Sequence, residues 1–183
     1  PSETFQQRNA NSGIKEAFDI IKRIKALSDT KNKELLVYLS MGFGNPYGDA
    51  WSNEIVLNWA EKLISEGVKH ISLADTIGIA TPGQIESLYK LLSGKFPSIE
   101  FGVHLHSTPD TWREKIEAAY KSGCRRFDTA LKGYGGCPMA KDKLTGNIAT
   151  ENVISYLQSQ KINLGLNMDK LQEAMDYSGK VFG

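Results

Sequence analysis

The stretch Phe101-Gly-Val-His-Leu-His-Ser107 organises the rest of this sequence. Its apolar residues alternate with Gly102, His104 and His106, and this period of two is typical of a β-strand. The two histidine side chains then project from one face of the strand, about 6.5–7 Å apart along it. Two imidazoles placed in this way can bind a single metal ion.

The position of the histidine pair in the chain favours a ligand role over an ordinary core or surface role. The chain has only three histidines, and the third, His70, lies just ahead of an apolar strand, where we interpret it as a structural residue. Thr108-Pro109-Asp110 ends the strand of the pair and begins a helix. The pair therefore lies at the carboxyl end of its strand, where α/β folds hold their active sites.

Composition limits the classes of function that remain. A chain of 183 residues can bury one sizeable core, and its 22 lysines and arginines are interspersed with 21 acidic residues. We therefore expect no nucleic-acid partner and no membrane partner. The sequence shows no apolar run near the roughly 20 residues that cross a bilayer and no signal peptide. We expect a cytoplasmic protein, or a protein of the mitochondrial matrix if the source is eukaryotic.

Hydrophobic periodicity alternates between the strand pattern and the helix pattern along the chain. Helices are predicted over residues 12–27, 52–66, 81–92, 110–122, 150–158 and 168–182, and strands over 35–40, 68–73, 101–107 and 126–131. Strand-helix units repeat about every 32–35 residues, which indicates an α/β fold with a parallel sheet. Ser12 is the expected N-cap of the first helix.

The number of units suggests part of a larger barrel. Four strand-helix units could form a complete open sheet or half of a (β/α)8 TIM barrel, which typically has about 250 residues. A four-stranded parallel sheet alone would leave two unpaired edges. We therefore expect residues 1–183 to form the C-terminal part of a single TIM-barrel domain, with its N-terminal strands outside this chain, which begins with proline rather than methionine.

Several chemically active residues follow the predicted strands, and their motifs resemble a known family. The candidate site residues are Asp75, His104, His106, Cys137 and Asn147. Four motifs around them, in the same order and spacing over essentially the whole chain, resemble the 3-hydroxy-3-methylglutaryl-CoA lyase family: Ser72-Leu-Ala-Asp-Thr-Ile-Gly78, Val103-His-Leu-His106, Gly133-Tyr-Gly-Gly-Cys-Pro-Met-Ala140 and Gly146-Asn-Ile-Ala-Thr150. The Gly-Gly-Cys-Pro loop is the specific part, because other barrels share His-x-His.

The resemblance implies a divalent cation held by His104, His106 and Asn147, with an aspartate from the first strand of the family's barrel. Such a mixed nitrogen and oxygen site suits Mg²⁺ or Mn²⁺. Without the resemblance, Asn147 would be interpreted as a left-handed turn or helix-cap residue. The first-strand segment of the family, with its arginine and metal aspartate, has no counterpart here. We therefore expect the chain alone to be inactive and to bind metal poorly.

The resemblance also implies a reaction and its partners. The family cleaves 3-hydroxy-3-methylglutaryl-CoA to acetoacetate and acetyl-CoA, in leucine degradation and ketone-body formation, so we expect an acyl-CoA substrate and a homo-oligomer, a dimer. Cys137 would be an acid or proton relay, in a loop whose glycines allow it to close, rather than an unreactive thiol. Cys124 is interpreted as a small buried residue.

Other residues near these motifs leave alternatives open. Asp75 could cap the amides of Ile77 or Gly78, or it could lie near the metal and orient a ligand or the substrate hydroxyl; we favour the second role. Ser107 replaces an aspartate that the family commonly has after the second histidine, which removes a carboxylate from that position. Arg125 and Arg126 are expected at the opposite face, with structural roles.

Three other functions compete with the lyase. Claisen-type synthases such as isopropylmalate or homocitrate synthase share His-x-His, but they typically carry a Gly-Glu-Arg-type loop where this chain has Gly135-Gly-Cys-Pro138. A non-catalytic barrel fragment is the second alternative. A zinc hydrolase is disfavoured, because such sites usually recruit further histidines and none follows His106.

Overall fold

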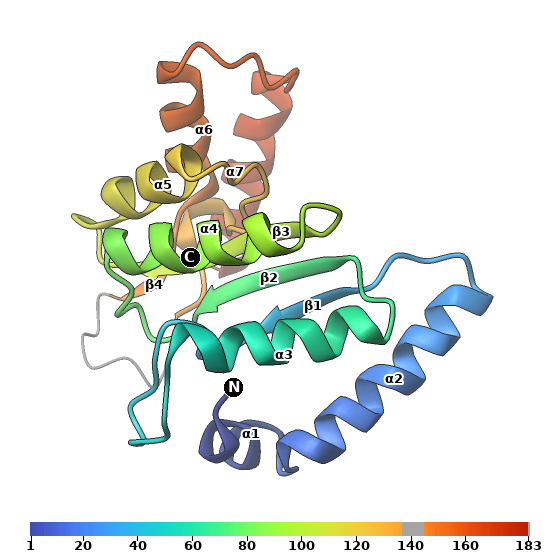
Figure 1. Cartoon of the computed structure of the whole chain (residues 1–183). Coiled ribbons are helices and arrows are strands. Elements are labelled where there is room, and N and C mark those ends of the chain that lie inside the picture. The colour runs from blue at the N-terminus through green and yellow to red at the C-terminus, as the bar shows by residue number, and fades with distance from the viewer. Residues whose placement is uncertain (137–144, 183) are drawn as a thin grey trace.

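A four-stranded sheet forms the centre of the molecule (Figure 1). The computed structural model describes residues 1–136 and 145–182. Within them the sheet has the order β1-β2-β3-β4, where β1 is Leu36–Leu39, β2 is His70–Asp75, β3 is Glu100–Ser107 and β4 is Gly146–Asn147. β1, β2 and β3 are parallel, whereas β4 is antiparallel to β3. The α/β class with a mostly parallel sheet is confirmed.

Helices connect and cover the strands. They are α1 (Glu3–Ala10), α2 (Ile14–Thr30), α3 (Asn53–Ser65), α4 (Pro82–Lys95), α5 (Trp112–Lys121), α6 (Thr150–Ser159) and α7 (Met168–Phe182), with a short 3-10 helix η1 (Leu131–Gly133). The expected N-cap Ser12 is wrong, because Gly13 occupies that position. Among the described residues, no helix combines the length and the apolar character needed to cross a bilayer.

Helix α1 was not predicted because its sequence has little apolar periodicity, and Phe5 is its one buried residue. Hydrogen bonds fix this helix instead. The Ser2 hydroxyl accepts from Phe5 N, and Asp49 accepts from the hydroxyls of Ser2 and Thr4. The N-terminal segment is thus held by a residue more than forty positions away.

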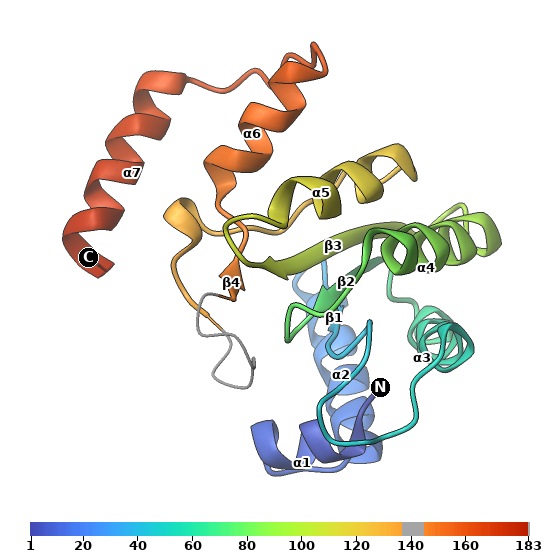
Figure 2. The ribbon, with the colours of Figure 1, turned by 90° about the vertical axis from the view of Figure 1, so that its left-hand side faces the viewer.

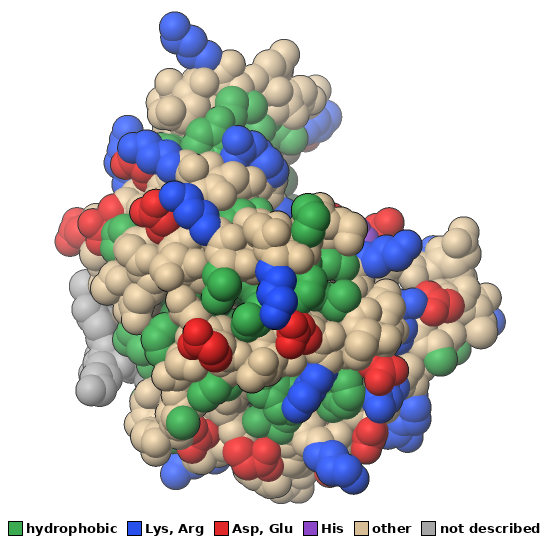
Figure 3. Space-filling model, viewed as in Figure 1, with side chains coloured by type: hydrophobic (Ala, Val, Ile, Leu, Met, Phe, Trp, Pro, Cys, Tyr) green, Lys and Arg blue, Asp and Glu red, His purple; other side chains and the backbone are tan. Residues whose placement is uncertain are grey.

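The core lies between one face of the sheet and the helices α3, α4 and α5 (Figure 2). Val103 and Leu105 of β3 are buried there against helix residues such as Leu88 and Ile116. The outer surface carries charges of both signs, and Figure 3 shows Lys, Arg, Asp and Glu side chains mixed over the face viewed. The residues that alternate with the core positions of β3 face the other side of the sheet.

The strand predicted over residues 126–131 is not a regular strand. Phe127 forms an isolated parallel bridge with Val103, and Ala130 forms another with Ala149. Residues 126–131 thus pair with β3 at one bridge only. They then hydrogen-bond to the segment that follows β4, since Ala130 N donates to Ile148 O at 3.3 Å. Two bridges to different partners do not build a ladder, and the position next to β3 is taken by the short β4.

Candidate metal centre

His104 and His106 lie on the same face of β3, as the sequence predicted, with ring centroids 5.1 Å apart. The Nδ1 atom of His104 lies 3.0 Å from the carbonyl oxygen of Asp128, and that of His106 lies 2.9 Å from the carbonyl oxygen of Thr76. Carbonyl oxygens only accept hydrogen bonds, so each Nδ1 carries a proton. In a neutral ring the lone pair is then on Nε2, which is the atom a metal would bind.

Asn147 faces His106 across the β3–β4 pairing, in which the two residues are register partners. Its Oδ1 lies 3.0 Å from His106 Nε2, and its Nδ2 donates to Tyr134 O at 2.8 Å. The second bond fixes which end of the amide points to the histidine. Asn147 is neither left-handed nor a helix cap, because Ala149 is the N-cap of α6, so that alternative does not hold.

The protonation state of His106 decides whether this pair of atoms could accept a cation. Burial and then the neighbouring His104 lower the pKa of His106, so its ring is neutral at neutral pH. Two acceptor atoms, Nε2 and Oδ1, then face each other at 3.0 Å. Ligands at about 2.1 Å in octahedral geometry place adjacent donors about 3.0 Å apart. The residues present therefore fit a divalent cation.

The glycines before Cys137 approach Asn147 closely. A Cβ at Gly135 would lie 2.9 Å from Asn147 Nδ2, and a Cβ at Gly133 would lie 2.8 Å from Asn147 O. Both glycines also have positive φ values, of 88° and 66°. They thus allow this segment to pack on Asn147 and orient its amide, which is a role beyond loop closure. Cys137 itself lies outside the described residues.

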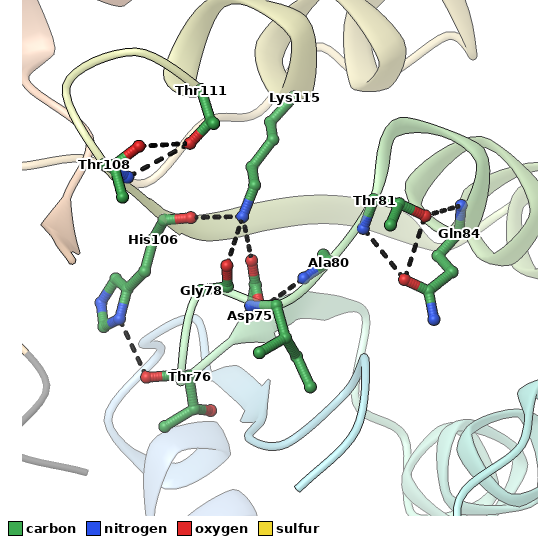
Figure 4. A network of polar contacts seen from close by, with 11 residues as sticks. Asp75, Thr76, Gly78, Ala80, Thr81, Gln84, His106, Thr108, Thr111 and Lys115 are labelled. Carbon is green, nitrogen blue, oxygen red and sulfur yellow. Dashed lines mark hydrogen bonds and ion pairs between the residues drawn. The ribbon is translucent and has the colours of Figure 1, made fainter. Parts of the chain in front are cut away.

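Asp75 is fully buried, and its hydrogen bonds differ from those expected for a cap of residues 77 and 78. Its Oδ1 accepts from Ile79 N at 2.9 Å and from Ala80 N at 3.1 Å, and its Oδ2 is paired with Lys115 Nζ at 2.8 Å. The capping alternative, which was not the favoured one, thus named the wrong amides, and the favoured role of Asp75 near a metal stays a prediction. Lys115 connects Asp75 to His106, because its Nζ also donates to His106 O at 2.7 Å (Figure 4).

Lys115 is a site residue that sequence reasoning missed. Its side chain is 4% exposed and belongs to α5, near the buried Ile116 and Ala119. A lysine next to the apolar stripe of an amphipathic helix is the signal that could have identified it, because lysines are almost never fully buried without a partner. Its partner Asp75, at the end of β2, was already a candidate site residue, but the sequence did not pair the two.

Arg125 and Arg126, which were expected at the opposite face, have different surroundings. Arg125 stacks over the Tyr120 ring at 4.4 Å, whereas Arg126 lies 3.7 Å from Glu100 at the start of β3 and 3.4 Å from Oδ1 of Asp128, the residue whose carbonyl binds His104 Nδ1. Cys124 is fully buried, as predicted, and burial raises the pKa of its thiol to about 11. Ser107 is buried and pairs with Gly146, and it brings no carboxylate to the site.

The donors that the described part of the chain brings together are two imidazoles and one amide. Within residues 1–136 and 145–182, no three His, Cys, Asp or Glu side chains gather in a way that could hold a metal ion. The expected aspartate ligand is therefore not among the described residues. A complete coordination sphere would need oxygen ligands in addition to His104, His106 and Asn147.

Comparison with known proteins adds evolutionary evidence to this geometry. Residues 2–177 match the family model described as HMGL-like. The chain is 32% identical over 182 residues to the hydroxymethylglutaryl-CoA lyase of Bacillus subtilis, an alignment that covers 100% of this chain and 60% of the relative. The crystal structure of the Bacillus subtilis HMG-CoA lyase superposes with a TM-score of 0.91 at 32% identity, covering 100% of this chain and 61% of that one.

A further solved structure contains a ligand. The HMG-CoA lyase of Acinetobacter baumannii, in complex with coenzyme A and 3-methylmalate, matches with a TM-score of 0.83 at 28% identity, covering 95% of this chain and 56% of that one. The chain thus spans 60% of the length of the Bacillus subtilis relative and 56% of the Acinetobacter baumannii chain. The matched structures are TIM barrels, so the described sheet corresponds to part of such a barrel.

Proposed function

Because the chain belongs to the HMGL-like family, we propose that it carries the metal site of a lyase that cleaves 3-hydroxy-3-methylglutaryl-CoA to acetoacetate and acetyl-CoA. The observation that carries this proposal is the approach of His106 Nε2 and Asn147 Oδ1 to 3.0 Å, two acceptor atoms with a common position for a cation. The chain spans 60% of the length of the Bacillus subtilis relative and 54% of that of the mouse mitochondrial relative. The remaining ligands and the arginine belong, in this proposal, to the other strands of the barrel.

His104, His106 and Asn147 would hold the cation, Mg²⁺ or Mn²⁺. When bound, such an ion supplies a Lewis acid that withdraws electron density from a substrate oxygen. Hydrogen bonds within the protein already orient the three side chains for this role. The carbonyl oxygens of Asp128 and Thr76 keep a proton on each Nδ1, and Tyr134 holds the amide oxygen toward the imidazole. Partners of this kind orient the ligands of metal sites.

The proposed reaction breaks the C2–C3 bond of the substrate. A base takes the proton of the tertiary hydroxyl, its oxygen forms the ketone of acetoacetate, and the bonding electrons pass to the thioester as an enolate. The Cys137 thiol gives its proton to C2 of that enolate, which yields acetyl-CoA, and the proton taken by the base restores the thiol. An ordinary thiol has a pKa of about 8.5, so it can both release and take up a proton at a pH near neutrality.

The first test concerns the metal site alone. Mn²⁺ binding would be measured by electron paramagnetic resonance for the chain, for Asn147→Leu and for the exposed control Asn58→Leu. Loss of the amide oxygen, and of the bond that the amide N–H group donates to Tyr134 O, should weaken binding at least about tenfold in Asn147→Leu, and the control should match the parent. Equal Mn²⁺ affinities in the parent and in Asn147→Leu would remove Asn147 from the site.

The second test concerns the reaction. Acetyl-CoA release from 3-hydroxy-3-methylglutaryl-CoA would be measured for this chain and for a form extended by the remaining barrel strands. Activity is expected only in the extended form, and Asn147→Leu should reduce it. Release of free CoA that depends on a 2-oxo acid would identify a Claisen-type synthase instead. Activity in the short chain would contradict the proposal that other strands complete the site.

A further inference from the structure

A buried ammonium group occupies the carboxyl ends of β2 and β3, and the proposed reaction gives it no role. Lys115 Nζ donates to Asp75 Oδ2 at 2.8 Å, to Gly78 O at 2.9 Å and to His106 O at 2.7 Å. An ammonium has three N–H donors, so these three acceptors satisfy it completely. Figure 4 shows the side chain of Lys115 reaching from α5 to these three groups.

The same ammonium fixes the turn that follows β2. Asp75 accepts from the amides of Ile79 and Ala80 with one carboxylate oxygen and binds Lys115 with the other. Gly78, whose carbonyl also binds Lys115, has a φ of +73°, and a Cβ there would lie 3.5 Å from His106 Cβ and would clash with Thr145. The turn over residues 75–80 therefore packs directly on the second histidine.

This turn carries the group that orients the His106 ring. Thr76 lies within it, and its carbonyl oxygen is 2.9 Å from His106 Nδ1. Lys115 thus restrains His106 in two ways. It binds the backbone carbonyl of the histidine, and it binds the turn whose Thr76 carbonyl accepts from the histidine ring. The two restraints come from one side chain of α5, which Figure 4 shows above both groups.

We propose that Lys115 is a positioning residue for the metal site, which keeps the proton of His106 on Nδ1 and directs Nε2 toward Asn147. This inference rests on the proposed function where it concerns a metal, but the orientation of the ring can be measured without one. A merely structural ion pair between Lys115 and Asp75 would affect the stability of the fold and leave the histidine tautomer unchanged.

The test compares Lys115→Met with the parent chain and with Lys121→Met, which removes an exposed lysine from the same helix. Long-range ¹H–¹⁵N correlation spectra of the metal-free proteins report the tautomer of each histidine, and His70, at the opposite end of β2, is the internal reference. The parent and Lys121→Met should show His106 protonated on Nδ1. Lys115→Met should show a mixture of tautomers, and its affinity for Mn²⁺ should fall by about 10–100-fold.

A second variant keeps the test valid if Lys115→Met does not fold, because that change leaves the buried Asp75 carboxylate without an opposite charge. Asp75→Asn combined with Lys115→Met removes both charges, and the same loss of the Nδ1 tautomer is expected. An unchanged His106 tautomer in a folded variant would overturn the inference. If Mn²⁺ binding is not measurable in this chain, the affinities are compared in the form extended by the remaining barrel strands. Absence of Mn²⁺ binding in that form would overturn the proposed metal site, and the tautomer spectra alone would then decide the role of Lys115.

Discussion

His104 and His106 are identical residues on one strand, and their surroundings give them different properties. His106 is 7% exposed and faces Asn147. His104 is half-buried, and the exposed ring of Tyr38 meets it edge-on with centroids 5.7 Å apart. Burial lowers the pKa of His106. At the scale of residues, each Nε2 is left for a ligand because a backbone carbonyl already occupies each Nδ1.

Cys124 offers a prediction at the same scale. Burial raises the pKa of its thiol to about 11, so the reactive thiolate is scarce at pH 8. In the Cys137→Ser variant, which leaves Cys124 as the remaining thiol, iodoacetamide should label the native protein very slowly at pH 8 and rapidly in urea. Mass spectrometry measures the labelled fraction. An unfolded thiol loses its proton at lower pH, so this group should also reduce the free energy of unfolding as the pH rises above about 8.5.

Rapid labelling of native Cys124 at pH 8 would contradict the burial of this side chain. A matched measurement with the exposed thiol of glutathione gives the rate expected for an unprotected group. The Sγ atom of Cys124 lies 3.1 Å from the carbonyl oxygen of Arg126, where it acts as a donor. This bond requires the protonated thiol.

At the scale of elements, the site depends on the pairing of β3 with β4. β3 is an eight-residue parallel strand with its core face against α4 and α5, whereas β4 has only two residues. Backbone hydrogen bonds from residues 133–136 hold this short strand on its other side. Asn147 N, for example, donates to Gly135 O at 3.1 Å. A short antiparallel strand thus brings the amide to the imidazole because the glycine segment supports it from the other side.

Gly135→Ala tests this support. The new Cβ would meet Asn147 Nδ2 at 2.9 Å and would require an alanine at a φ of +88°, so the amide must move. Mn²⁺ affinity should fall about tenfold or more. Gly94→Ala is the matched control, because a Cβ there has no neighbour within 4 Å, and this helical substitution should stabilise the protein by up to about 1 kcal/mol.

Both effects can be followed by the same two measurements, a Mn²⁺ titration and urea unfolding. A Gly135→Ala protein that binds Mn²⁺ as well as the parent would show that the packing of Gly135 on Asn147 is dispensable. A loss of Mn²⁺ affinity in Gly94→Ala would show that the titration responds to general changes in stability rather than to the site.

At the scale of the whole molecule, the sheet has an open side. Among the described residues β1 pairs only with β2. Apolar side chains are exposed on β1 and on the preceding helix α2, with Tyr38 at 44%, Ile24 at 44% and Leu27 at 59%. An unpaired edge strand beside exposed apolar groups favours association with another chain. This arrangement is consistent with a sheet that corresponds to part of a TIM barrel.

The chain by itself should therefore self-associate. Sedimentation equilibrium should show an average mass that rises with protein concentration, and Ile24→Lys combined with Leu27→Lys should shift the equilibrium toward the monomer. Leu166→Lys, which changes a residue that is 50% exposed between α6 and α7, is the control and should behave as the parent. A chain that stays monomeric at all concentrations would contradict both this prediction and the expected homo-oligomer.

The sequence alone determined the features that depend on local order. The period of two placed His104 and His106 on one face, and the alternation of strand and helix patterns gave the α/β class. The motifs around Asp75, Cys137 and Asn147 identified the family that the comparisons show. Most strand and helix positions follow from the same local patterns. Helix α1 was not predicted, because hydrogen bonds to Asp49 hold it in place rather than an apolar face.

Only the tertiary structure decided which distant groups meet. The opposition of Asn147 and His106 depends on an antiparallel pairing of two residues, which has no periodicity to detect. The irregular path of residues 126–131 depends on competition between β3 and the segment after β4 for the same backbone groups. The burial of Lys115 depends on three acceptors contributed by β2, its following turn and β3. Hydrogen bonds between remote segments leave little trace in a sequence, because each partner alone is an ordinary polar residue.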